Sequence, residues 1–167
     1  MFAASKTAKA ASAAAATDPQ FNYVTMLLHG DGTNGAQNNT FLDSSTNNFT
    51  ITRNGNTTQG TFTPYGSNWS NYFDGTGDYL SVPDNAALEG FTDFTLECWV
   101  YVSDFSSGDC IFAKGWTPGG YIPYMFYFTS TDLVFYASSS LSSWDVASGE
   151  VIVSNIAKNQ WYHVAAS

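Results

Sequence analysis

The most constraining feature of this sequence is the segment 94–102, in which two kinds of side chain alternate without a break. One set of alternate positions is apolar: Phe94, Leu96, Cys98, Val100 and Val102. The other set carries a carboxylate and two large rings: Thr95, Glu97, Trp99 and Tyr101. Because successive side chains of a β-strand point to opposite faces, this pattern predicts a strand with one face on a core. Such a strand needs partner strands, which the rest of the chain must supply.

Ten further short segments have strand character and are separated by turn residues. They lie at 24–29, 49–52, 57–65, 69–73, 78–82, 111–113, 124–128, 133–136, 151–153 and 161–165. The dipeptide Asn54-Gly55 is a strong signal for a hairpin, and no segment shows a convincing helical pattern. Composition agrees, because 44% of the residues are hydrophobic, 17% are aromatic and only 11% are charged. We therefore expect an all-β fold, an antiparallel β-sandwich or jelly roll.

Several stretches carry a family resemblance. They are YFDGTGDYLSVP at 72–83, FTLECWV at 94–100, IFAKG at 111–115 and NQWYHVA at 159–165. In this order and spacing they resemble the strands of concanavalin A-like lectin/glucanase domains of the laminin-G-like kind. The earlier stretches LLHGDG at 27–32 and FLDSS at 41–45 are similar to the first strands of versions common in bacteriophage and bacterial surface proteins.

The resemblance implies where the domain lies in the chain. We expect the sandwich to occupy residues 21–167, preceded by a separate segment at 1–20. In domains of this kind, several more strands follow the one that NQWYHVA resembles. Because the sequence stops at Ser167, the resemblance implies a sandwich that is incomplete at its C-terminus.

The N-terminal segment differs in composition from everything after it. Residues 1–17 are rich in alanine, contain Lys6 and Lys9, and have no strongly apolar core, so they resemble a secretory signal poorly. Two interpretations stay open, a disordered tail or an arm that becomes ordered against another subunit. No stretch has the length needed to span a bilayer, so membrane insertion is not expected.

The acidic composition of the chain bears on which kinds of partner it can bind. The formal net charge is −9, and no cluster of basic residues follows Lys6 and Lys9, so no nucleic-acid partner is expected. No cofactor is expected either, and the sequence leaves metal ligands unknown. The loop residues Asp31, Asn34, Asp43 and Asp74 would suit calcium. Asp before Gly is also an ordinary turn residue, so both interpretations stay open.

The carboxylates argue against catalysis. Glycoside hydrolases use a pair of carboxylates across the scissile bond, but Glu89, Glu97 and Glu150 have no spacing of that kind. We expect Glu97 to hydrogen-bond a neighbouring loop. His29 and His163 lack a partnered Ser or Cys motif and are expected to be structural or partly exposed, not catalytic. The chain is therefore expected not to be an enzyme, with a glycoside hydrolase as the remote alternative.

Aromatic residues in loops are the best functional clue. Trp116, Tyr121, Tyr124 and Trp144 lie in or beside stretches rich in Gly, Pro and Ser. Sugars stack on exposed rings, because one face of a sugar is apolar while its hydroxyls seek polar groups nearby. We take these four residues as a candidate sugar platform, and the alternative is that the rings fill the core.

The two cysteines, Cys98 and Cys110, flank a short polar stretch that has the character of a turn. Two alternatives follow from a hairpin at this point, a disulfide between the strands or two buried thiols in neighbouring strands.

Two functions compete on this evidence. The first is a non-catalytic structural or appendage protein of a bacteriophage virion, which contacts other virion proteins through its N-terminal arm and a cell-surface glycan through its sandwich. The second is a secreted or surface carbohydrate-binding adhesin module of a bacterium. The fold alone does not separate them, because the sandwich carries many functions.

Overall fold

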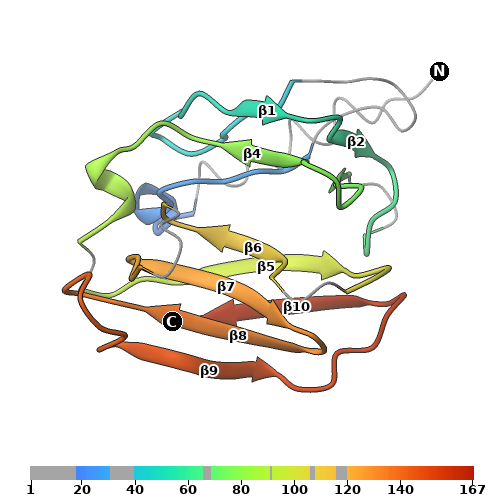
Figure 1. The fold of residues 1–167 in the computed structure, drawn as a ribbon. Helices are drawn as coiled ribbons and strands as arrows, with labels where there is room; N and C mark the ends of the chain where they lie inside the picture. Colours follow the sequence, from blue (N-terminus) through green and yellow to red (C-terminus); the bar gives the residue numbers. More distant parts are fainter. Residues whose placement is uncertain (1–17, 31–39, 66–68, 91, 106–107, 116–119) are drawn as a thin grey trace. The chain divides into compact units, whose positions relative to one another are not determined.

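The computed structural model describes residues 18–30, 40–65, 69–90, 92–105, 108–115 and 120–167. In this part of the chain the backbone forms ten strands and two short 3-10 helices, and every strand pairing is antiparallel (Figure 1). The chain divides into two compact units, Met1–Asp84 and Asn85–Ser167. The described residues include no helix that is long and apolar enough to cross a membrane. The all-β antiparallel fold is thereby confirmed.

The first unit contains two small sheets. Its elements are η1 (Phe21–Tyr23), β1 (Thr52–Asn54), β2 (Thr58–Gly60), β3 (Ser70–Tyr72) and β4 (Tyr79–Ser81). β1 pairs with β4, and β2 pairs with β3. The strand expected at 24–29 is reduced to a single bridge between Leu28 and Asp43.

The turn at Asn54-Gly55 does not form the expected hairpin. It joins β1 to β2, which belong to different sheets. The Asp78 carboxylate holds this turn, accepting the Asn56 N–H at 2.6 Å and the Asp74 N–H at 3.0 Å. The hydrogen bond from Asp74 is the largest of several that place the pKa of Asp78 below its usual value. Thus the Asp-Gly-Thr-Gly-Asp stretch closes on the Asn-Gly-Asn turn, which is a structural reason for that motif.

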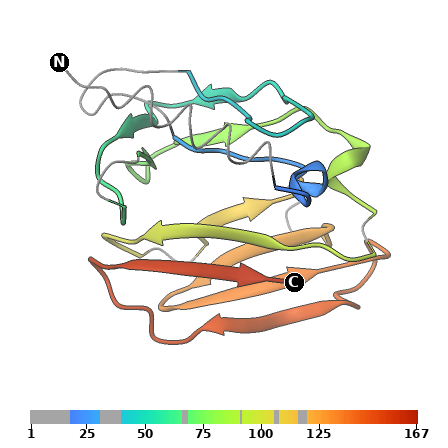
Figure 2. The same ribbon diagram turned by 180° about the vertical axis from the view of Figure 1, so that it is seen from behind.

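The second unit carries most of the regular structure. Its elements are η2 (Ala86–Leu88), β5 (Leu96–Tyr101), β6 (Cys110–Ala113), β7 (Tyr124–Thr129), β8 (Asp132–Ala137), β9 (Ala147–Val153) and β10 (Trp161–Ala166). The order of the four-stranded sheet is β6-β7-β8-β9, and β5 pairs with β10 in a second sheet. Figure 2 shows β5 and β10 side by side.

The two sheets of the second unit share one hydrophobic core. Phe126 of β7 and Leu133 of β8 are completely buried, and Val164 of β10 is 2% exposed. The apolar face of β5 packs against this cluster through Leu96 and Val100, while Trp99 on its other face is 42% exposed. The alternation in 94–102 therefore predicted the orientation of β5 correctly. Sheet-on-sheet packing of this kind is the defining feature of a β-sandwich.

The cysteines do not face each other across a hairpin, because β5 pairs with β10 and β6 pairs with β7. Both thiols are free. Burial of the sulfur, with a smaller effect from Glu97, raises the pKa of Cys98 to about 12, and burial raises the pKa of Cys110 to about 11. At neutral pH both thiols are protonated. Cys98 is half-buried and Cys110 is exposed, and their strands belong to different sheets, so the alternative of two buried thiols in neighbouring strands is also wrong.

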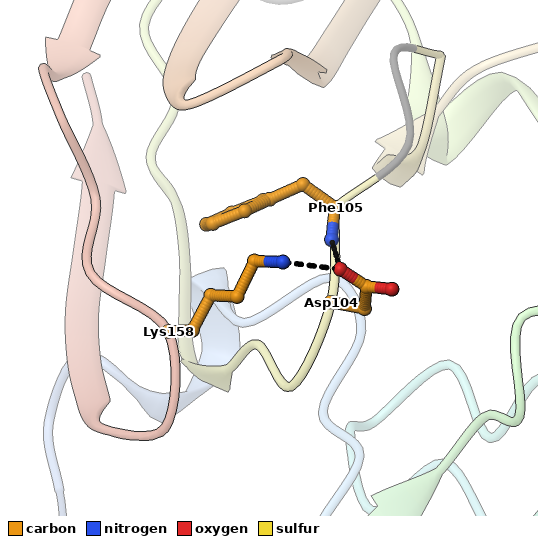
Figure 3. A network of polar contacts seen from close by, with 3 residues as sticks. All are labelled: Asp104, Phe105 and Lys158. Atoms are coloured by element: carbon orange, nitrogen blue, oxygen red, sulfur yellow. Dashed lines mark hydrogen bonds and ion pairs between the residues drawn. The ribbon is translucent and has the colours of Figure 1, made fainter.

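A polar contact closes the loop after β5 onto the turn before β10 (Figure 3). The Lys158 ammonium pairs with the Asp104 carboxylate, which also accepts the Phe105 N–H at 3.0 Å. The Lys158 nitrogen lies 5.6 Å from the centre of the Phe105 ring. Hydrogen bonding to Lys158 is the main reason why the pKa of Asp104 lies below its usual value.

The expected N-terminal arm, residues 1–20, lies outside the described residues except for its last three. There the Gln20 N–H donates to the Asp18 carboxylate at 2.8 Å, immediately before η1 begins at Phe21.

Candidate functional site

The outer face of the four-stranded sheet carries aromatic rings because β7 and β8 each place a tyrosine next in sequence to a core phenylalanine. Tyr124, Phe126 and Phe128 of β7 are buried, while Tyr127 between them is only partly buried. In β8, Phe135 faces the core and Tyr136 faces outward. The register pairs Phe126 with Phe135 and Tyr127 with Val134, so each strand contributes one tyrosine to the outer face.

Four rings follow one another across this part of the second unit, and we call them the aromatic strip: Tyr121, Trp144, Tyr136 and Tyr127. The ring centres of Tyr121 and Trp144 are 5.2 Å apart, those of Trp144 and Tyr136 5.1 Å, and those of Tyr136 and Tyr127 6.5 Å. Tyr121 is 38% exposed. Neighbouring rings are inclined by 55° to 82°, as edge-to-face contacts prefer.

The Tyr136 ring packs against Gly149, where a larger residue would collide with it. Gly149 of β9 has a φ of +82° and lies at an irregularity in the pairing of β8 with β9. A Cβ atom at this position would lie 2.8 Å from the hydroxyl oxygen of Tyr136 and 2.9 Å from its Cζ. Only glycine suits both the backbone conformation and the closeness of the ring.

The loop between β8 and β9 places Trp144, and Asp145 holds that loop together. Its carboxylate accepts the Ser139 N–H at 2.8 Å and the Ser139 hydroxyl at 2.7 Å. The Leu141 N–H donates to the hydroxyl of Ser138 at 2.9 Å. The hydrogen bonds from Ser139 lower the pKa of Asp145 to about 2. Asp145 is therefore a permanent anion at neutral pH, adjacent in sequence to Trp144.

The four residues that the sequence proposed for the sugar platform have different positions in the structure. Tyr121 and Trp144 are in direct contact, and Trp116 lies outside the described residues. Tyr124 requires a correction. It is 8% exposed and its ring lies 6.1 Å from that of Phe94, so it belongs to the core.

The sequence interpretation missed Tyr127 and Tyr136. The alternation within each strand was the available signal, because Tyr127 lies one position from the apolar Phe126 and Phe128. The same reasoning places Tyr124 on the inner face, two positions from Phe126.

Comparison with known protein families gives a match that covers the second unit. The family model of the concanavalin A-like lectin/glucanases superfamily matches residues 74–167. The chain belongs to this superfamily. No curated protein matches the sequence and no solved structure matches it. The matched region contains the whole second unit and hence the aromatic strip. Laminin-G-like domains of this superfamily are generally non-catalytic binding modules, and the fold is compatible with carbohydrate binding.

Some members of the superfamily are glycoside hydrolases, which draws attention to Glu97. Its carboxylate oxygen lies 3.5 Å from Nε2 of His163 on the neighbouring strand, so the expected loop partner is wrong. The rings of Trp99 and His163 lie 5.2 Å apart on the same outer face of the β5–β10 sheet. Glu97 thus has a cross-strand basic partner of the kind that stabilises sheets.

The candidate calcium ligands have structural roles where they are described. The Asp43 carboxylate is buried and accepts the N–H groups of Leu27, Ser45 and Phe49, each at 2.9 Å. Asp74 accepts the Asn56 amide at 3.0 Å and the Thr76 N–H at 2.7 Å. Among the described residues no group of three or more His, Cys, Asp or Glu side chains is placed to hold a metal ion. Asp31 and Asn34 lie outside those residues, and calcium binding stays a prediction.

Proposed function

We propose that the chain is a non-catalytic glycan-binding module of a bacteriophage virion, and that the aromatic strip is its sugar site. The observation that carries the proposal is the run of four contacting rings on the outer side of the second unit, with Tyr121 exposed. These rings lie outside the hydrophobic core of that unit, in a superfamily whose fold suits carbohydrate binding.

The strip has the two kinds of surface that a sugar requires. The ring faces of Trp144 and Tyr121 offer apolar contact to the C–H face of a sugar, by analogy with other aromatic contacts worth about 1 kcal/mol. The loop that carries Trp144 also supplies hydroxyls on exposed residues, from Ser139, Ser140 and Ser142. Ring and hydroxyl together favour a carbohydrate over a purely apolar ligand.

Binding at one such site is weak, because few rings contact one sugar. Useful attachment then comes from many copies that engage the same surface, since linked sites gain affinity from a high effective concentration. A virion presents its proteins in many copies. The similarity of segments 27–32 and 41–45 to the first strands of phage and bacterial surface versions supports this setting.

The experiment is glycan-array binding of the purified chain and its Trp144→Ala and Tyr121→Ala variants. We expect each substitution to weaken binding about fivefold, because each removes a stacking surface worth about 1 kcal/mol. Tyr72→Ala is the matched control, since Tyr72 is 60% exposed but belongs to the first unit. If all three variants fold and bind as the parent does, the strip is not the sugar site. Cleavage of the bound glycan that disappears in Glu97→Gln would overturn the non-catalytic part of the proposal.

A further inference from the structure

The segment that builds the aromatic strip contains no basic residue. Between residues 115 and 157 the sequence has no Lys, Arg or His, and its charged residues are Asp132, Asp145 and Glu150. All four rings of the strip come from this segment. The chemistry offered to a ligand is therefore aromatic, hydroxylic and anionic.

The basic residues that flank this segment are engaged with carboxylates. The Lys114 nitrogen lies 3.8 Å from the Glu89 carboxylate, and the Lys114 side chain is only 12% exposed. Lys158 pairs with Asp104 and lies over the Phe105 ring (Figure 3). Turning either lysine toward a ligand on the strip would require breaking its ion pair.

The residue after Trp144 in the loop carries a fixed negative charge. Asp145 follows Trp144 directly, and its carboxylate accepts two hydrogen bonds from Ser139. The Ser140 side chain also hydrogen-bonds this carboxylate. An ionised carboxylate has about four lone-pair positions, so Asp145, which is exposed, keeps capacity for a further donor. A sugar hydroxyl is such a donor, and hydrogen bonds to a charged acceptor are the stronger kind.

We propose that the aromatic strip selects neutral sugars, whose hydroxyls donate to Asp145, and rejects glycans that carry carboxylate, sulfate or phosphate groups. This inference rests on the proposed function. Recognition of an anionic sugar requires a cationic partner, commonly arginine in bidentate geometry. A ligand on Trp144 would instead bind beside the residue that carries the Asp145 charge, and like charges brought together without a partner oppose binding.

The test is an array on which each glycan core is present both as a neutral form and as its sulfated or sialylated counterpart. We expect the full chain to bind neutral cores at least tenfold more strongly than their anionic counterparts, at low salt and at high salt alike. Binding should fall in Trp144→Ala. In Asp145→Asn, which loses the charge, binding to neutral cores should fall about tenfold, as expected for loss of a charged acceptor.

A second variant tests whether charge causes the selectivity. Ser143 is exposed and lies next to Trp144, so Ser143→Lys adds a cation at the strip without removing a hydrogen bond from Asp145. It should raise binding to the anionic counterparts several-fold and leave binding to neutral cores unchanged. Unchanged discrimination in this variant contradicts the electrostatic explanation.

The two proposals fail in different ways. Trp144-dependent binding that is as strong for anionic as for neutral forms overturns the selectivity and leaves the glycan site in place. If no glycan is bound, or if Trp144→Ala binds as the parent does, the proposed function is overturned and the selectivity with it. The proposed function is also overturned if the chain binds no glycan but binds a protein ligand, and Trp144→Ala abolishes that binding.

Discussion

Asp43 shows how one buried carboxylate organises a part of the chain with little regular secondary structure. It is 4% exposed and accepts hydrogen bonds from three backbone N–H groups and from the Ser45 hydroxyl at 2.8 Å. These contacts tie the segments before and after it, at Leu27 and Phe49, to one anion. Irregular backbone is stable in a compact unit when its polar groups are paired in this way.

We expect Asp43→Asn to lower the free energy of unfolding by about 2 kcal/mol or more. Asparagine keeps one acceptor oxygen, but its NH₂ group would face N–H donors, and hydrogen bonds to a charged acceptor are worth roughly 1.5–3 kcal/mol each. Urea unfolding followed by tryptophan fluorescence measures the loss. Asp93→Asn is the control, because Asp93 is exposed and surface changes usually stay within about 0.5 kcal/mol.

The same residue makes a prediction about pH. Burial raises the pKa of Asp43, but its hydrogen bonds from Leu27, Phe49 and Ser45 outweigh burial and leave the pKa below its usual value. A depressed pKa means that the stabilisation is complete above the unfolded value of about 3.9 and is lost as the pH falls through the lower folded value. The stability difference between the parent and Asp43→Asn should therefore shrink below pH of about 4. A constant difference at lower pH contradicts this explanation.

At the scale of elements, the junction of β8 and β9 determines whether the strip forms. The alternation of β8 turns Tyr136 outward, and the irregularity at Gly149 leaves room beneath its ring. We expect Gly149→Ala to lower the free energy of unfolding by more than 1 kcal/mol, because a left-handed conformation alone costs a non-glycine residue about 1–2 kcal/mol. Displacement of the Tyr136 ring should also weaken glycan binding.

A second glycine separates these two effects. Gly90 has a similar φ of +71°, but a Cβ atom there would meet nothing within 4 Å. Gly90→Ala should thus cost backbone strain of the same order and leave glycan binding unchanged. Thermal unfolding and array binding of the two variants provide the comparison. Equal binding by Gly149→Ala and the parent would remove Tyr136 from the site.

The elements also show which sequence signals were sufficient. Strand positions followed from alternation, and all six strands of the second unit overlap predicted segments, although β9 (Ala147–Val153) begins four residues before the predicted segment 151–153. Pairing did not follow, because an Asn-Gly turn favours a hairpin only while no other partner competes. Here the Asp78 carboxylate accepts a hydrogen bond from Asn56 in the turn, and β1 pairs with β4. The sequence predicted two of the four residues of the strip, Tyr121 and Trp144, because they lie in loops rich in turn residues. Tyr127 and Tyr136 lie within strands, and their place beside each other follows only from the register of β7 and β8.

At the scale of the whole molecule, the sequence resemblance identified the family, and the match over residues 74–167 confirmed it. Function at this scale depends on how the module is attached. We expect that deleting residues 1–19 leaves the melting temperature unchanged, because the alanine-rich segment has little apolar surface to bury. On the proposed virion role, the shortened protein should fail to enter the virion, measured by its presence in purified particles.

Each other result of that deletion has a clear meaning. Normal incorporation shows that the segment is dispensable for attachment. A deleted protein that does not fold places the segment in the core and moves the expected boundary at residue 20.

The loop that carries Trp144 has a consequence for how such a module changes over time. The Ser138 N–H at the base of this loop donates to the Pro123 carbonyl at 3.0 Å. The hydrogen bonds of the rest of the loop join its residues to one another: Ser139 to Asp145, Leu141 to Ser138, and Ser142 to Ser140. Because these bonds are internal, residues at its tip can be exchanged while the sheet below keeps its packing. On the proposed sugar site, a change of ligand preference then needs only a few consecutive codons to change. Grafting this loop between homologous modules would transfer ligand preference in the same way.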